Sequence, residues 1–109
     1  MTPENLNMEE ITDARRKAIA ESIRTISTEE LKALGERLFP LVDHPWREKF
    51  FGFITDNRGA TFHHAATHDH VQIIYCPAKD KGMWFMPGIG MGPMQPKGLG
   101  ILKQIVEGR

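Results

Sequence analysis

Four of the five histidines fall within eight residues in the middle of the chain: His63, His64, His68 and His70. Imidazole is the commonest protein ligand for transition metals such as zinc. If this segment were a strand, His68 and His70 would face the same side, about 6.6 Å apart. A two-residue turn at Thr67-His68 would instead pair Ala65 with His70. Either arrangement brings two imidazoles together, so the segment is a candidate site for zinc or another divalent transition metal.

Two imidazoles do not complete a zinc site, which takes three or four protein ligands. Cys76 lies roughly 20 Å beyond His70 in an extended chain, so it cannot share their ion. A third ligand would have to come from His44, from a carboxylate or from a second subunit. The simplest interpretation is therefore that these are partly exposed surface histidines of a β-hairpin. Metal binding is the first alternative, and acid–base catalysis or a pH switch is the second.

Residues 87–97 are rich in glycine, proline and methionine, and they join an expected strand to an expected helix. Backbone amides at glycines near a helix N-terminus can bind an anion, and a lysine there adds a positive charge. The candidate ligand-binding residues are therefore Gly88, Gly90, Gly92 and Lys97. The pattern is neither the dinucleotide-binding fingerprint nor a P-loop, and the prolines favour a stiff connecting loop.

Four methionines lie in and beside this segment: Met83, Met86, Met91 and Met94. Thioethers together with imidazoles can hold Cu(I), but methionines more often fill cores or adaptable interfaces. Because surface loops are usually polar, the apolar side chains of Ile89, Met91 and Met94 must be covered by the last helix or by a partner chain. We predict a homodimer contact here, since a formal net charge of zero also mildly favours self-association.

The single cysteine, Cys76, excludes an intrachain disulfide. It ends an expected strand and no Cys/His catalytic signature surrounds it, so we predict a buried and unreactive thiol. Balanced charge, with 14 basic and 14 acidic residues, argues against nucleic-acid binding. The chain carries neither a signal peptide nor a transmembrane stretch, which favours a soluble, cytoplasmic protein.

The N-terminal part of the chain predicts two helices. An Asn7–Glu10 capping box precedes a helix expected over residues 8–26, and residues 1–6 are expected to be flexible. A second capping box at Ser27–Glu30 starts a helix that Pro40 ends. Residues 43–58 fit either a helix opened by Pro45 or a strand, and the spacing of the aromatic residues favours the helix.

The remaining residues predict paired strands and one closing helix. Strands are expected over 60–65, 71–76 and 83–86, and residues 77–82 have the composition of a turn. Residues 97–107 carry an amphipathic helical pattern. With 109 residues, the chain is expected to form a single α+β domain, in which a three- or four-stranded antiparallel meander packs against the C-terminal helix.

The absence of a readable catalytic motif favours a non-enzymatic binding or regulatory protein over an enzyme. We expect it to act through self-association and through a ligand or partner contact at the 71–86 hairpin and the 87–97 loop. No cofactor is predicted for this role. The alternative is a histidine-dependent metal-binding protein or small metalloenzyme that uses the histidines at 63–70.

Overall fold

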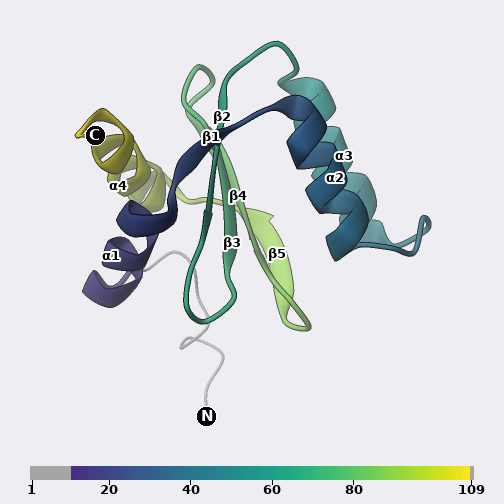
Figure 1. Cartoon of the computed structure of the whole chain (residues 1–109), viewed down its shortest axis with the longest axis horizontal. Coiled ribbons are helices and arrows are strands. Elements are labelled where there is room, and N and C mark those ends of the chain that lie inside the picture. The colour runs from purple at the N-terminus through teal and green to yellow at the C-terminus, as the bar shows by residue number, and fades with distance from the viewer. Residues whose placement is uncertain (1–10, 109) are drawn as a thin grey trace.

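A five-stranded antiparallel sheet lies at the centre of the molecule, with helices on both of its faces (Figure 1). The structure, a computed structural model, describes residues 11–108. Over these residues the elements follow one another as α1 (Asp13–Ser22), β1 (Arg24–Ile26), α2 (Thr28–Leu38), α3 (Pro45–Asp56), β2 (Phe62–Ala66), β3 (Gln72–Cys76), β4 (Lys81–Met86), β5 (Gly90–Pro93) and α4 (Pro96–Glu107). The strand order β1-β2-β3-β4-β5 makes the sheet a simple meander, and the predicted α+β class is confirmed.

Each face of the sheet is covered by one pair of helices, α1 with α4 and α2 with α3 (Figure 1). Successive side chains of a strand point to opposite faces, so each strand contributes to two cores. The core under α1 and α4 is mainly aliphatic and includes Ile19, Ile23, Ala65, Val71, Ile73, Tyr75, Met86, Met94, Leu102 and Ile105. The core under α2 and α3 is richer in aromatic rings and includes Ile26, Leu31, Leu34, Phe39, Phe50, Ile54, Phe62, Ile74, Cys76 and Phe85.

The predicted helix over residues 8–26 is wrong at its C-terminal end. Helix α1 stops at Ser22, and residues 24–26 form edge strand β1, which pairs with β2. A continuous helix would place Ile23 and Ile26 on the same face, whereas the structure buries them on opposite faces of the sheet. The helix begins after Thr12, whose hydroxyl accepts a hydrogen bond from the Arg15 amide at 3.2 Å. The proposed Asn7–Glu10 cap and the flexibility of residues 1–6 lie outside the described residues.

The second and third helices follow the predictions. Ser27 and Glu30 form the expected capping box, and α2 ends before Pro40. Helix α3 confirms the helical interpretation of residues 43–58, and the strand alternative is wrong. His44 caps it, because its Nδ1 accepts a hydrogen bond from the Trp46 amide at 3.1 Å.

The sheet has five strands, whereas three or four were predicted, and one of the unexpected strands is the last, β5. Residues 90–93 lie in the expected loop but form β5, which pairs with β4. Glycine is depleted in strands, so Gly90 and Gly92 concealed this strand. A Cβ atom at Gly92 would lie 3.4 Å from the Trp84 indole nitrogen, and one at Gly90 would lie 3.6 Å from the same ring system. The indole therefore packs over the two glycines and replaces their missing side chains.

A tight turn connects β4 to β5. The Ile89 amide donates a hydrogen bond to the Met86 carbonyl at 3.0 Å, and Gly88 has a φ of 77°. Pro87 followed by a glycine with positive φ is the combination that a type II turn favours.

No helix within the described part of the chain is long and apolar enough to cross a membrane.

Candidate ligand pocket at the β5 edge

A cavity of about 340 Å³ lies where β5 ends and the chain turns toward α4. Small-molecule sites typically measure about 300–1,000 Å³, so this cavity falls at the lower end of that range. Its lining comes from the start of β4, the end of β5 and one residue from each of α3 and α4: Phe53, Lys81, Gly82, Met83, Pro93, Met94 and Leu99. Below we call this cavity the β5-edge pocket.

The pocket exists because β5 is shorter than β4. The last register pair is Met83 with Pro93, and the Met94 amide then donates to the Gly82 carbonyl at 2.8 Å. Beyond this point Lys81 has no partner residue in β5. The uncovered end of β4 is flanked by Phe53 from α3 and by Leu99 from α4, so both helix layers contribute to one cavity.

Close packing around Gly82 shapes the floor of the pocket. A Cβ atom there would lie 3.1 Å from Met94 Cγ, 3.3 Å from Leu99 Cδ2 and 3.1 Å from the Ile74 carbonyl oxygen. Glycine thus lets these two apolar side chains approach the strand. Lys81, which is exposed, is the one charged residue of this lining. The β5-edge pocket is therefore an apolar cavity with a cation at its rim.

The four residues predicted to bind an anion lie in different settings. Gly88 is in the β4–β5 turn, Gly90 and Gly92 are in β5, and Lys97 is exposed in the first turn of α4. The hydrogen bond from Met94 to β4 fixes the alternation of the ladder, so the amides of Gly90 and Gly92 also face β4. Those two amides are engaged within the sheet.

The structure distributes the four clustered histidines over both faces of the sheet and one turn. His63 lies on the α1/α4 face, with its Nδ1 3.5 Å from Thr25 Oγ1. His64 lies on the α2/α3 face, and its Nε2 is 2.7 Å from Gln72 Oε1. His68 and His70 are exposed in the β2–β3 turn.

Both predicted arrangements of this histidine segment are wrong. Ala65 pairs with Ile73 rather than with His70, and residues 67–71 form the turn. His70 adopts a φ of 67°, the left-handed conformation that ends a three-residue hairpin loop. Among residues 11–108, no three His, Cys, Asp or Glu side chains lie close enough together to hold a metal ion. The predicted burial of Cys76 is confirmed.

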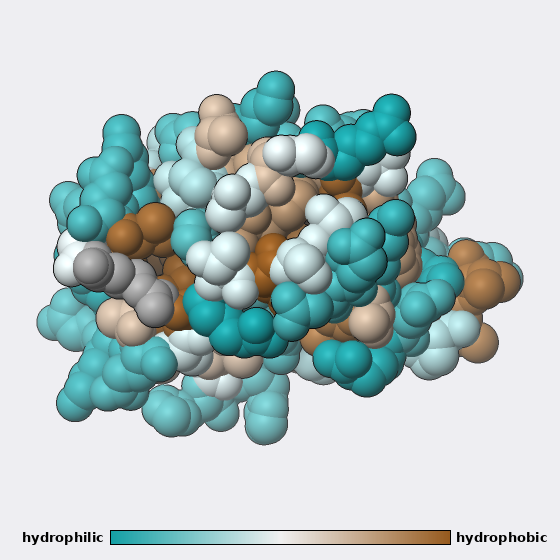
Figure 2. Space-filling model, turned by 45° about the horizontal axis from the view of Figure 1, so that its top comes forward, coloured by the Kyte–Doolittle hydropathy of each residue, from teal (hydrophilic) through white to brown (hydrophobic). Residues whose placement is uncertain are grey.

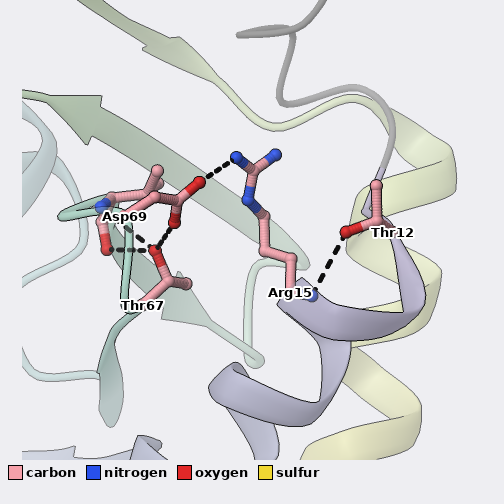
Figure 3. Close-up of polar contacts among 5 residues, drawn as sticks. Thr12, Arg15, Thr67 and Asp69 are labelled. Carbon is pink, nitrogen blue, oxygen red and sulfur yellow. Dashed lines mark hydrogen bonds and ion pairs between the residues drawn. The ribbon is translucent and has the colours of Figure 1, made fainter.

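A polar network that the sequence did not indicate fixes the β2–β3 turn against α1 (Figure 3). Arg15, whose side chain is only 9% exposed, forms an ion pair with Asp69, and the Thr67 hydroxyl donates to the same carboxylate. Desolvation raises the pKa of Asp69, but these hydrogen bonds from Thr67 and Arg15 outweigh it and hold that pKa below its ordinary value. Because its partners are 54 residues apart in the sequence, this ion pair has no local signature.

The pocket residues Phe53 and Leu99 were also missed as ligand contacts. Each continues the apolar pattern of its helix, so the sequence assigns both to the core. Comparison with known proteins adds no assignment, because no protein-family model, curated protein or solved structure matches this chain.

Proposed function

We propose that this protein is a non-enzymatic binding protein whose ligand is a small amphipathic anion, held in the β5-edge pocket. The observation that carries the proposal is an apolar cavity of about 340 Å³ whose one charged lining residue is Lys81. An apolar ligand body would replace water against Met94 and Leu99, and a carboxylate would lie near the lysine ammonium. The pocket combines the hairpin and the 87–97 segment, which are the regions from which the sequence predicts binding.

Octanoate is a suitable probe, because it joins a short apolar chain to one carboxylate. Isothermal titration of the full-length protein should give saturable binding. Replacing Leu99 with tryptophan should fill the cavity and weaken binding at least about tenfold, which corresponds to roughly 1.4 kcal/mol. Ala20→Trp is the matched control, since Ala20 is exposed on α1 and does not line the pocket.

The charge of Lys81 can be tested separately. Lys81→Gln, and octanol in place of octanoate, should each weaken binding by about two- to fivefold, the usual contribution of an exposed ion pair. Lys79→Gln should leave binding unchanged, because Lys79 lies in the adjacent turn and outside the pocket. Absence of octanoate binding, or equal binding by the Leu99→Trp protein, would contradict the proposal.

We further propose self-association through side chains around the β4–β5 turn. Ile89 is 53% exposed, and Met91 is half-buried beside it. Pairing between two β5 edges is disfavoured, because the ladder points the backbone of Pro93 outward and proline lacks an amide hydrogen. Light scattering should give twice the chain mass of 12.4 kDa, and Ile89→Asp should restore the monomer. A single-chain mass at high concentration would end this proposal.

Two other sequence-based expectations stay proposals. A cytoplasmic location is supported by the single cysteine, because proteins of oxidising compartments often carry paired cysteines. Metal binding by the histidines has weaker support, because a complete ligand set would need residues from outside the described chain or from a second molecule. Zinc titration of the wild type and of a His68→Ala/His70→Ala variant decides it, and stoichiometric binding lost in the variant would favour the metal function over the pocket.

A further inference from the structure

A second, smaller cavity lies at the opposite edge of the sheet, between β1, β2 and α2. Its volume is about 160 Å³. It differs from the β5-edge pocket in having four side chains that carry charge or can take up a proton, among a lining of Arg24, Ile26, Glu30, Ala33, Leu34, Arg37 and His64. We call it the β1-edge pocket.

The strand register brings a guanidinium and an imidazole together in this pocket. Arg24 pairs directly with His64 across β1 and β2, on the face that α2 covers. Side chains in such a pair start about 5 Å apart at their Cβ atoms. Arg37 reaches the same region from the last turn of α2. Two guanidiniums therefore converge on one half-buried imidazole.

The hydrogen-bonding state of His64 is set from the strand side. Its Nε2 lies 2.7 Å from Gln72 Oε1, and a proton on this nitrogen satisfies the amide oxygen, which can only accept. Desolvation lowers the pKa of His64; the hydrogen bond to Gln72 opposes this change, and the positive charges of Arg24 and Arg37 add to it. The lowered pKa favours the neutral ring, and the two guanidiniums are the permanent cations of the pocket lining.

One carboxylate opposes these cations without neutralising them. Glu30 Oε2 lies 3.6 Å from Arg24 Nη1, and both side chains are more than half exposed. An exposed pair with this spacing contributes little binding energy. The other oxygen, Glu30 Oε1, accepts the Ser27 amide of the capping box at 3.0 Å. Two arginines against one glutamate leave an excess of one positive charge at the cavity.

We propose that the β1-edge pocket binds a phosphate dianion, either free inorganic phosphate or the terminal group of a small phosphomonoester. Planar guanidiniums match phosphate oxygens with paired hydrogen bonds, which makes arginine the usual residue for this group. The cavity volume suits a single phosphoryl group. The proposal concerns a different edge of the sheet from the octanoate site, so each can fail without the other.

The test is a titration of the isotope-labelled, full-length protein with inorganic phosphate at constant ionic strength, followed by NMR signals of Arg24, Arg37 and His64. Saturable shifts confined to this pocket are expected. Arg24→Gln and Arg37→Gln should each weaken binding about tenfold, and Arg37→Lys should fall between Arg37→Gln and the wild type, because it keeps the charge without the fork. A repeat with glycerol 3-phosphate separates the two sources, since tighter binding would identify the monoester.

Glu30→Gln provides a change in the opposite direction. Glutamine retains the acceptor of the capping box but removes the competing charge, so phosphate should bind several-fold more tightly. Arg58→Gln, at an exposed site outside the pocket, is the matched control and should have no effect. Circular dichroism of each variant confirms folding. The proposal is overturned if shifts do not saturate up to tens of millimolar phosphate, or if Arg58→Gln weakens binding as much as Arg37→Gln.

Discussion

The two edges of the sheet are both short strands, yet the pockets beside them have opposite chemistry. At the β5 edge the lining is apolar and includes the buried residues Gly82 and Met94. At the β1 edge it includes the exposed, charged residues Arg24, Glu30 and Arg37. The apolar groups of the first pocket are thus shared with the α1/α4 core, whereas the charged groups of the second are exposed above the α2/α3 core.

Stability and binding should therefore be coupled at the β5 edge and separable at the β1 edge. A residue that both fills the core and lines a cavity cannot be changed without affecting the fold. Exposed charges away from the core usually change the free energy of unfolding by less than about 0.5 kcal/mol. Substitutions at the two edges should therefore separate clearly in denaturant titrations.

Met94 should affect folding most, because it is 6% exposed and packs in the α1/α4 core. Met94→Ala should lower the free energy of unfolding by about 2–5 kcal/mol, because it removes buried surface and leaves a cavity. Met91→Ala, at a half-buried position, should cost less. Urea denaturation of both variants measures the difference, and equal losses would show that Met94 is not part of the core.

A smaller loss is expected at Gly82, where a methyl group would press on the Ile74 carbonyl, Met94 and Leu99. Gly82→Ala should lower the free energy of unfolding by about 1–3 kcal/mol, as overpacking does. Gly100→Ala is the matched control, since that exposed helical site has open space. It should raise stability by about 0.5–1 kcal/mol, and a loss at Gly100 comparable to that at Gly82 would contradict the packing argument.

The β1 edge should respond to pH through His64. Desolvation lowers the folded-state pKa of His64, so the unfolded chain binds its proton first as the pH falls. The contribution of His64 to the free energy of unfolding is therefore fully present above about pH 6.5. It decreases as the pH falls toward the lower pKa of His64 in the folded protein. His64→Gln should remove that part of the dependence, which lies below about pH 6.5. The neighbouring charges Arg24, Glu30 and Arg37 are unchanged in this variant, and an identical pH profile would refute the effect.

The smallest effect on folding is predicted for Arg24. Arg24→Gln removes only a 3.6 Å pair with Glu30 between side chains that are 58% and 54% exposed. The free energy of unfolding should change by less than about 0.5 kcal/mol, while phosphate binding weakens. Exposed ion pairs contribute at most about 1 kcal/mol to the free energy of unfolding. A larger loss in the Arg24→Gln protein would show that the two edges do not differ as proposed.

The elements that the sequence predicts correctly are those specified by residues close to one another in the chain. The capping box at Ser27–Glu30, the helix-opening Pro45 and the β-branched residues of β3 act within a few residues, and each element appears where its signal lies. Strand β1 was missed because it is only three residues long and depends on pairing with β2. Strand β5 was missed because Trp84, on another strand, supplies its packing.

The two pockets were less predictable than the fold. The β5-edge pocket, for example, depends on β5 being shorter than β4. The sequence indicated the hairpin and residues 87–97, and the β5-edge pocket lies there. It could not indicate that Phe53 and Leu99 would meet across the end of a short strand. The sequence grouped the histidines by proximity along the chain, whereas strand alternation and the β2–β3 turn separate them.

The loop between α2 and α3 offers the main competing surface for an apolar ligand. Leu41 and Val42 are 65% and 79% exposed there. Figure 2 shows brown, hydrophobic surface at its right-hand end, where Figure 1 places this loop. A ligand that binds by non-specific apolar contact would reach these side chains more easily than a recessed cavity.

Intermolecular nuclear Overhauser effects from bound octanoate would locate the ligand on the protein. The β5-edge pocket predicts contacts from the terminal methyl group to the methyl groups of Met94 and Leu99, and their loss in the Leu99→Trp protein. Contacts only to Leu41 and Val42, or contacts that survive Leu99→Trp, would contradict the account.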